Sequence, residues 1–114
     1  MLTIRGKRIT FNRGDDIYIQ MTVYDVDGQP YVLKEGDKLY FSAKTKATDK
    51  NYAIPPKEFE YDVLHLAPED TYDLAFGTYV YDVQLITAGG RTTTILKESE
   101  MIVEAAITAY GNRW

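Results

Sequence analysis

The sequence contains no cysteine among its 114 residues, and this absence excludes several kinds of protein at once. Without cysteine there is no disulfide framework, no cysteine-ligated zinc site and no thiol nucleophile. The absence fits synthesis in the cytoplasm, where disulfides are rare. Long apolar runs are also missing, because uninterrupted ones are only a few residues long, such as residues 101–103. No such run can span a bilayer, so we expect no membrane partner. Arg5, Lys7 and Arg8 interrupt the opening segment, so we expect no secretory signal peptide there.

Basic residues are scarcer than acidic ones, since 13 Lys and Arg stand against 17 Asp and Glu, a net charge of -4. Nucleic-acid binding needs a basic surface that neutralises phosphates, so we expect no nucleic-acid partner. The charges are unevenly placed. Residues 1–13 carry only basic charges, whereas residues 58–104 are strongly acidic. The two regions could attract each other within one chain or between copies, or they could simply be solvated faces of a small acidic domain.

Tyrosine is abundant, with ten residues, and the periodic stretches are rich in Thr, Ile and Val. These side chains are typical of β-strands. In residues 17–24 apolar and polar side chains alternate with a period of two, which predicts a strand with one buried face. Further strands are predicted at residues 38–46, 59–66, 79–85, 92–97 and 101–107, with short ones at residues 2–4 and 8–11.

The connections between these strands have recognisable signals. Residues 25–28 and 88–91 read as tight turns, and residues 47–57 as a loop containing two prolines. The register of residues 59–66 changes phase, which predicts a bulge or break near Val63. Residues 67–74 begin with proline and acids and predict one or two helical turns, centred on 68–74.

Six to eight strands without a strong helix predict an all-β, antiparallel sandwich or barrel, and the length suits a single domain over residues 1–114. The residues that share the inward phase form the expected core: Ile17, Ile19, Met21, Val23, Leu39, Phe41, Tyr79, Val83 and Leu85.

Residues 69–71 (Glu-Asp-Thr), followed by residues 77–81 (Gly-Thr-Tyr-Val-Tyr), resemble the corner of immunoglobulin-type domains, where an acidic turn leads to Gly-x-Tyr-x-Cys. The resemblance implies an immunoglobulin-like sandwich in which the Tyr79 hydroxyl bonds to backbone within residues 67–74. Tyr81 stands at the position of the cysteine, and no tryptophan lies in mid-chain. We therefore do not expect an antibody-type domain.

Five segments follow one another in a characteristic order: residues 11–16 (Phe-Asn-Arg-Gly-Asp-Asp), 25–30, 41–44, 66–71 and 77–83. This order resembles small tail and baseplate proteins of phages and prophages of Gram-positive hosts, especially the N-terminal domain family of baseplate upper proteins. The resemblance implies a virion structural or assembly protein, usually one of many copies in a complex. It would be located in the virion, or in the cytoplasm of the bacterial host during assembly.

Residues suited to catalysis are few. His65 is the only histidine, and it lies between two leucines with no nucleophile motif nearby, so we interpret it as structural and expect no enzyme. Asp25 and Asp27 resemble part of a calcium loop, but an Asp-Gly turn explains them, and Asp15 and Asp16 add no complete ligand set. We expect no metal and no cofactor.

Three tyrosines form the candidate interface. Tyr18 and Tyr24 are predicted to share the outward face of the first long strand, and Tyr40 that of the next. Outward aromatic rings can fill a protein interface, stack on sugar rings, or pair across strands and merely stiffen the sheet. The hypotheses are therefore a virion structural protein that contacts other virion proteins or itself, and, as the alternative, a carbohydrate-binding module that recognises host-surface glycans.

Overall fold

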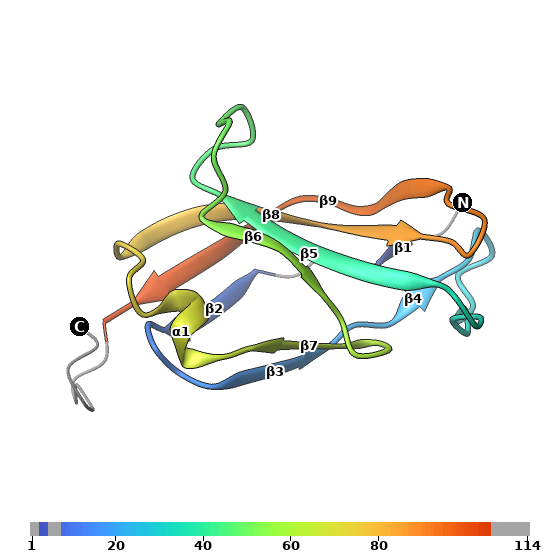
Figure 1. Ribbon diagram of the computed structural model, residues 1–114, viewed down its shortest axis with the longest axis horizontal. Helices are drawn as coiled ribbons and strands as arrows, with labels where there is room; N and C mark the ends of the chain where they lie inside the picture. Colours follow the sequence, from blue (N-terminus) through green and yellow to red (C-terminus); the bar gives the residue numbers. More distant parts are fainter. Residues whose placement is uncertain (1–2, 5–7, 106–114) are drawn as a thin grey trace.

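The computed structural model describes residues 3–4 and 8–105, with backbone alone at residues 3–4 and 97–98 (Figure 1). Leu2, Arg5, Lys7 and Ile107, which entered the predictions for the two terminal segments, lie outside the described residues.

The described part of the chain consists of strands and one short helix. In order these are β1 (Thr3–Ile4), β2 (Ile9–Asn12), β3 (Ile17–Gln20), β4 (Val23–Tyr24), β5 (Lys38–Lys44), β6 (Ile54–Glu58), β7 (Val63–Leu66), α1 (Pro68–Thr71), β8 (Gly77–Ile86) and β9 (Thr92–Glu104). The all-β prediction is confirmed, and α1 lies within the predicted helical turn.

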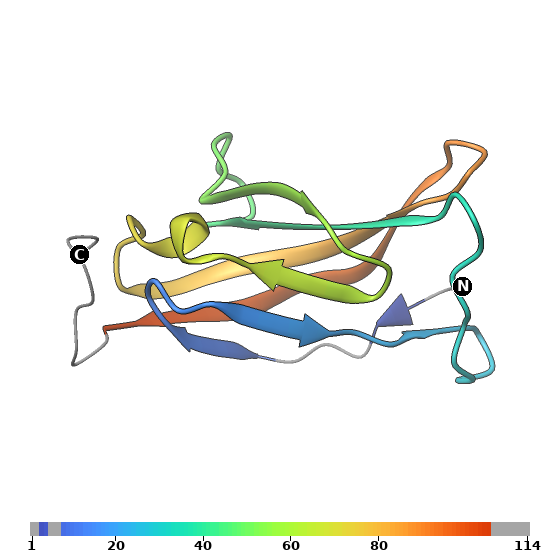
Figure 2. The same cartoon turned by 60° about the horizontal axis from the view of Figure 1, so that its bottom comes forward.

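The strands form two layers around one core. The larger sheet has the order β2-β9-β8-β5-β6, while β3 pairs with β7 and β4 pairs with β1. Figures 1 and 2 show the β3–β7 pair lying over one face of the larger sheet. Buried side chains from both layers belong to a single hydrophobic cluster. The protein is therefore an all-β sandwich.

One edge of the larger sheet corrects the antiparallel prediction. β2 runs parallel to β9, with Ile9 opposite Met101 and Asn12 opposite Glu104. The other strand pairs are antiparallel. A parallel neighbour needs a long connection, and here most of the domain separates β2 from β9. Alternation in the sequence indicates which face is buried but not in which direction the neighbouring strand runs.

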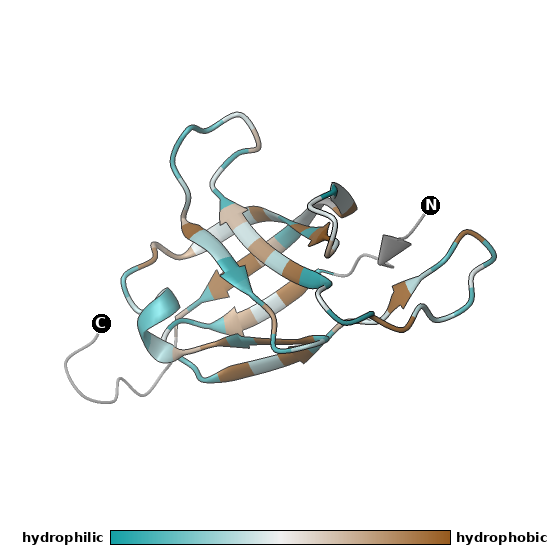
Figure 3. Cartoon of the chain, turned by 45° about the vertical axis from the view of Figure 1, so that its right-hand side comes forward, coloured by the Kyte–Doolittle hydropathy of each residue, from teal (hydrophilic) through white to brown (hydrophobic). Residues whose placement is uncertain are grey.

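Burial follows the predicted alternation closely. Figure 3 shows the change between hydrophobic and hydrophilic residues along the strands. Seven of the nine predicted core residues are buried: Met21, Val23, Leu39, Phe41, Tyr79, Val83 and Leu85. The other two, Ile17 and Ile19, are half-buried and pack against the same core.

Strand boundaries differ from the prediction where proline or a change of partner intervenes. β6 (Ile54–Glu58) lies inside the predicted loop of residues 47–57, and its Pro55 and Pro56 are exposed. An edge strand tolerates proline because the missing N–H groups are not needed by a further neighbour. The predicted strand at residues 59–66 is shortened to β7, because the chain turns at Tyr61, which has φ +56.

The first and last long segments also differ from expectation. The predicted strand at residues 17–24 is divided into β3 and β4, which pair with β7 and β1 respectively. Conversely, residues 92–97 and the start of 101–107 belong to one continuous strand, β9. Its pairing with β8 shifts register on both sides of Val83, which lets a 13-residue strand keep its apolar side chains inward.

Candidate functional site

The corner before β8 is held by a tyrosine hydroxyl. Tyr79 is buried, and its hydroxyl donates a hydrogen bond to the carbonyl oxygen of Ala75 at 2.6 Å. The prediction of a backbone acceptor was right in kind, but the acceptor lies one residue after the predicted segment 67–74. Burial, with a further contribution from the charge of Asp73, raises the pKa of the Tyr79 phenol above 10.0.

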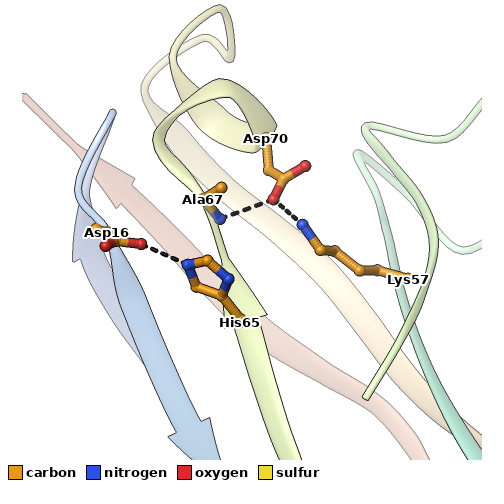
Figure 4. A network of polar contacts seen from close by, with 5 residues as sticks. All are labelled: Asp16, Lys57, His65, Ala67 and Asp70. Carbon is orange, nitrogen blue, oxygen red and sulfur yellow. Dashed lines mark hydrogen bonds and ion pairs between the residues drawn. The ribbon is translucent and has the colours of Figure 1, made fainter. Parts of the chain in front are cut away.

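Thr71 and Asp70 connect the helix to two other parts of the fold. The side chain of Thr71 is fully buried, and its Oγ1 accepts a hydrogen bond of 3.0 Å from the backbone N–H of Gly14. Asp70 accepts a bond of 2.8 Å from the N–H of Ala67 and also pairs with Lys57 of β6 (Figure 4). These contacts fix α1 against the turn after β2 and against the opposite sheet edge.

Tyr18, the first predicted interface residue, lies on the outer face of the β3–β7 pair and is 66% exposed. Its ring stacks on His65, its cross-strand neighbour, with centroids 4.3 Å apart and planes inclined by 3°. The Nε2 of His65 lies 2.5 Å from Oδ1 of Asp16 (Figure 4). Asp16, Tyr18 and His65 together are called the Tyr18 face. It presents an exposed aromatic ring whose orientation is set by the stack on His65 before any partner binds.

Tyr40, the third predicted interface residue, lies on the outer face of the larger sheet. It lines a groove of about 290 Å³ together with Ser42 of β5 and with Asp82 and Gln84 of β8. Tyr52, in the connection between β5 and β6, lines the same groove. These five residues define the tyrosine groove. Its polar groups are already oriented: the Tyr40 hydroxyl donates to Glu58 at 3.3 Å, and the Ser42 hydroxyl donates to Asp82 at 3.3 Å.

Tyr24, the second predicted interface residue, is half-buried on β4 and lines a different hollow of about 410 Å³ with Arg8, Ile19 and Met21. The three tyrosines therefore do not form one surface. Tyr18 and Tyr40 point away from opposite sides of the sandwich, because the residues beside them on β3 and β5 face the core between the layers. The predicted interface divides into separate surfaces.

The charges of the terminal strands meet within one chain. The guanidinium of Arg8, next to β2, lies 2.9 Å from a carboxylate oxygen of Glu100 on β9. Both side chains are at least half exposed, so the pair adds little to stability. This pair is one contact within a single chain between the basic start and the acidic second half.

Asp25 and Asp27, two of the four residues considered for metal binding, lie in a turn. Oδ1 of Asp25 accepts hydrogen bonds from the N–H groups of Asp27 and Gln29, and Gly28 has φ +79. Within residues 3–4 and 8–105 no group of three or more potential metal ligands is present. In the same residues, no helix has the length and apolar character needed to span a membrane.

Sequence reasoning missed Tyr52, Ser42, Asp82 and Gln84. Ser42, Asp82 and Gln84 share the outward phase of their strands, and the pairing of β5 with β8 places Ser42 opposite Asp82 and Tyr40 opposite Gln84. The outward phase could be predicted from the alternation in the sequence, but the pairing of β5 with β8 could not. Tyr52 lies in an irregular connection, where periodicity gives no signal.

Comparisons with protein-family models and with curated proteins found no match.

Proposed function

We propose that the sandwich is immunoglobulin-like. The sheet order β9-β8-β5-β6 corresponds to strands G, F, C and C′ of such domains, and β3 with β7 corresponds to B and E of the opposite sheet. β1, which pairs with β4, takes the place of strand A. Only residues 59–62 connect β6 to β7, which leaves no room for a strand D.

Two features of the core support this assignment. In immunoglobulin domains a tryptophan on strand C packs against the disulfide that reaches strand F. Phe41 occupies the middle of β5, and its ring centroid lies 5.2 Å from that of Tyr81, which stands in the cysteine position. Tyr79 lies two residues earlier and bonds to backbone a few residues upstream, as the corner tyrosine of strand F does.

We further propose that the protein is a non-enzymatic component of a phage or prophage tail or baseplate, acting through contacts with other virion proteins or with itself. The virion, or the bacterial cytoplasm during assembly, is then its location. The order of sequence segments that resembles baseplate proteins supports the assignment to a virion. The observation that carries the contact function is the Tyr18 face.

The Tyr18 face has the properties of a protein contact. Aromatic residues are enriched in interfaces. Because Tyr18 is already stacked on His65, and His65 is held by Asp16, binding would immobilise few additional rotamers. β3 and β7 pair only with each other in the described part of the chain, so the outer edge of this layer is also open to a partner. His65 is thereby assigned to a contact and not to catalysis.

The contact is tested by sedimentation velocity over a range of protein concentrations, at low and high salt. We expect Tyr18→Ala to weaken association at least about tenfold, while Tyr40→Ala, on the opposite face, leaves it unchanged. Association through aromatic rings should persist as salt rises, whereas charge-driven association would weaken. Equal behaviour of the two variants would contradict the assignment. A monomer at every concentration would remove self-association and leave only contacts with other virion proteins.

The virion role is tested independently by the genes on either side of this one. Tape-measure, tail-fibre and lysin genes are expected there, and a neighbourhood of metabolic genes would contradict the proposal. Glycan recognition is the second candidate function, because Tyr40 and Tyr52 line a groove that also contains polar side chains.

A further inference from the structure

We propose that the tyrosine groove binds one ring of a neutral saccharide. This inference does not depend on the Tyr18 face, which lies on the opposite side of the sandwich. It also does not require the protein to be a virion component.

The floor of the groove carries hydrogen-bonding groups at regular spacing. In the pairing of β5 with β8, Tyr40 lies opposite Gln84 and Ser42 lies opposite Asp82. Directly opposed side chains on one face start about 4.5–5.5 Å apart. A hydroxyl, a carboxylate and an amide are thus gathered within the width of a small ring. Asp82 accepts the Ser42 hydroxyl through Oδ1, and a carboxylate has about four acceptor sites, so capacity for sugar hydroxyls remains.

The sides of the groove supply apolar surface. Tyr52 is 47% exposed and lines the groove with Pro56 of β6. The connection that carries Tyr52, residues 45–53, rises away from the sheet at the top of Figure 1. It is held there by Lys44, whose ammonium donates to the carbonyl oxygen of Asp49 at 2.8 Å and lies 4.8 Å from the Tyr52 ring centroid. A pyranose ring combines apolar C–H faces with equatorial hydroxyls. The apolar sides of the groove are complementary to the C–H faces, and its polar floor is complementary to the hydroxyls.

Charge and size favour a neutral ligand over an anionic one. The groove contains the carboxylate of Asp82, and Glu58 contacts its Tyr40 hydroxyl. The ammonium of Lys44 is already engaged by Asp49 and Tyr52. Lys44 keeps its positive charge, but Asp82 and Glu58 balance it, so the groove has no excess positive charge that would attract an anionic sugar or a phosphate. A volume of about 290 Å³ lies at the small end of ligand pockets, which suits a single ring better than a chain of rings bound end to end.

The proposal is tested by titrating the isotope-labelled chain of 114 residues with glucose, galactose, N-acetylglucosamine and rhamnose, and by following amide shifts in NMR spectra. Sorbitol, which has similar hydroxyls but no ring, is the ligand control. We expect at least one sugar to give saturable shifts on β5 and β8, with a Kd of about 1 mM, and none on β3 and β7. Shifts should be absent with sorbitol.

Variants separate stacking from hydrogen bonding. Tyr52→Ala should weaken binding about tenfold, and Asp82→Ala by a similar factor, because each removes one type of contact. Tyr18→Ala, on the opposite face, should bind as the wild type does. Each variant's amide spectrum reports its fold directly, so a folding defect is recognised as such.

Four results would overturn the proposal. One is the absence of saturable shifts with all four sugars up to about 100 mM, far above a millimolar Kd. The second is a shift map centred elsewhere, and the third is equal affinity in Tyr52→Ala and wild type. The fourth is that groove amides shift with protein concentration alone, which would identify the groove as a contact between copies. None of these results depends on whether Tyr18→Ala alters sedimentation, so the two proposals fail separately.

Discussion

Phe41 contributes most clearly to the stability of the fold at the level of single residues. Its side chain is fully buried in the centre of the core, against Tyr81. Truncation of a buried aromatic side chain removes its burial free energy and leaves a cavity, so Phe41→Ala should lower the free energy of unfolding by about 3–5 kcal/mol. Urea unfolding measures this directly. Ser42→Ala, on the outer face of the same strand, is the control and should cost much less. A loss below about 1 kcal/mol in Phe41→Ala would contradict its central position.

Tyr79 stabilises the fold in two ways, through its buried ring and through one hydrogen bond from its hydroxyl. Tyr79→Phe keeps the ring but removes the hydroxyl that donates to Ala75. Because the Ala75 carbonyl then lacks this donor, we expect a loss of about 1–3 kcal/mol in unfolding free energy near neutral pH. Thermal or urea unfolding of the two proteins checks it. An unchanged midpoint would argue against the corner as a stabilising element.

From the raised pKa of the Tyr79 phenol we expect the free energy of unfolding to fall at high pH. Burial raises the pKa of Tyr79 in the folded protein above its value of 10.0 in the unfolded chain. The unfolded chain therefore loses this proton first as pH rises, so the stabilisation is fully present below pH 10.0 and is lost as pH passes through the folded pKa. The Tyr79→Phe variant has no hydroxyl to ionise at this position, so it does not lose stability in this way. The stability difference between wild type and Tyr79→Phe should narrow above about pH 10, and a constant difference would contradict the assignment.

At the scale of elements, Thr71 ties α1 to the turn that follows β2. Thr71→Val keeps the shape of the side chain but removes the oxygen that accepts the N–H of the buried Gly14. An unpaired buried donor costs about 1–3 kcal/mol, which urea unfolding would detect. Thr78→Val, at an exposed position of β8, is the matched control and should change stability by less than about 0.5 kcal/mol. Equal effects of both substitutions would show that the link is not stabilising.

Elements were predictable to the extent that local periodicity defines them. β5 and β8 have regular alternation and lie where the sequence predicts them. β6 was missed because Pro55 and Pro56 are typical of loops, and only its position at a sheet edge allows them in a strand. The parallel pairing of β2 with β9 could not be predicted, since the direction of a neighbour depends on contacts between distant segments.

At the scale of the whole molecule, the two proposed contact surfaces lie on opposite layers. The Tyr18 face belongs to the β3–β7 layer and the tyrosine groove to the five-stranded sheet. The alternation in the sequence predicted that both Tyr18 and Tyr40 face outward. It could not assign them to different surfaces, because an outward position does not show which layer the strand joins. The stack of Tyr18 on His65 likewise depends on the pairing of β3 with β7. An arrangement of this kind would let one domain hold a protein partner and a sugar at the same time.

We propose that the Tyr18 face makes the protein contacts of a virion component. Photo-cross-linking from position 18 tests it most directly, with a benzophenone amino acid replacing Tyr18 in cells that also express the neighbouring genes. The same amino acid at Tyr40, on the opposite layer, is the control. We predict cross-links from position 18 to a second copy or to a tail or baseplate protein, and none to these proteins from position 40. Free monomer alone from position 18, or the same products from both positions, would contradict the claim.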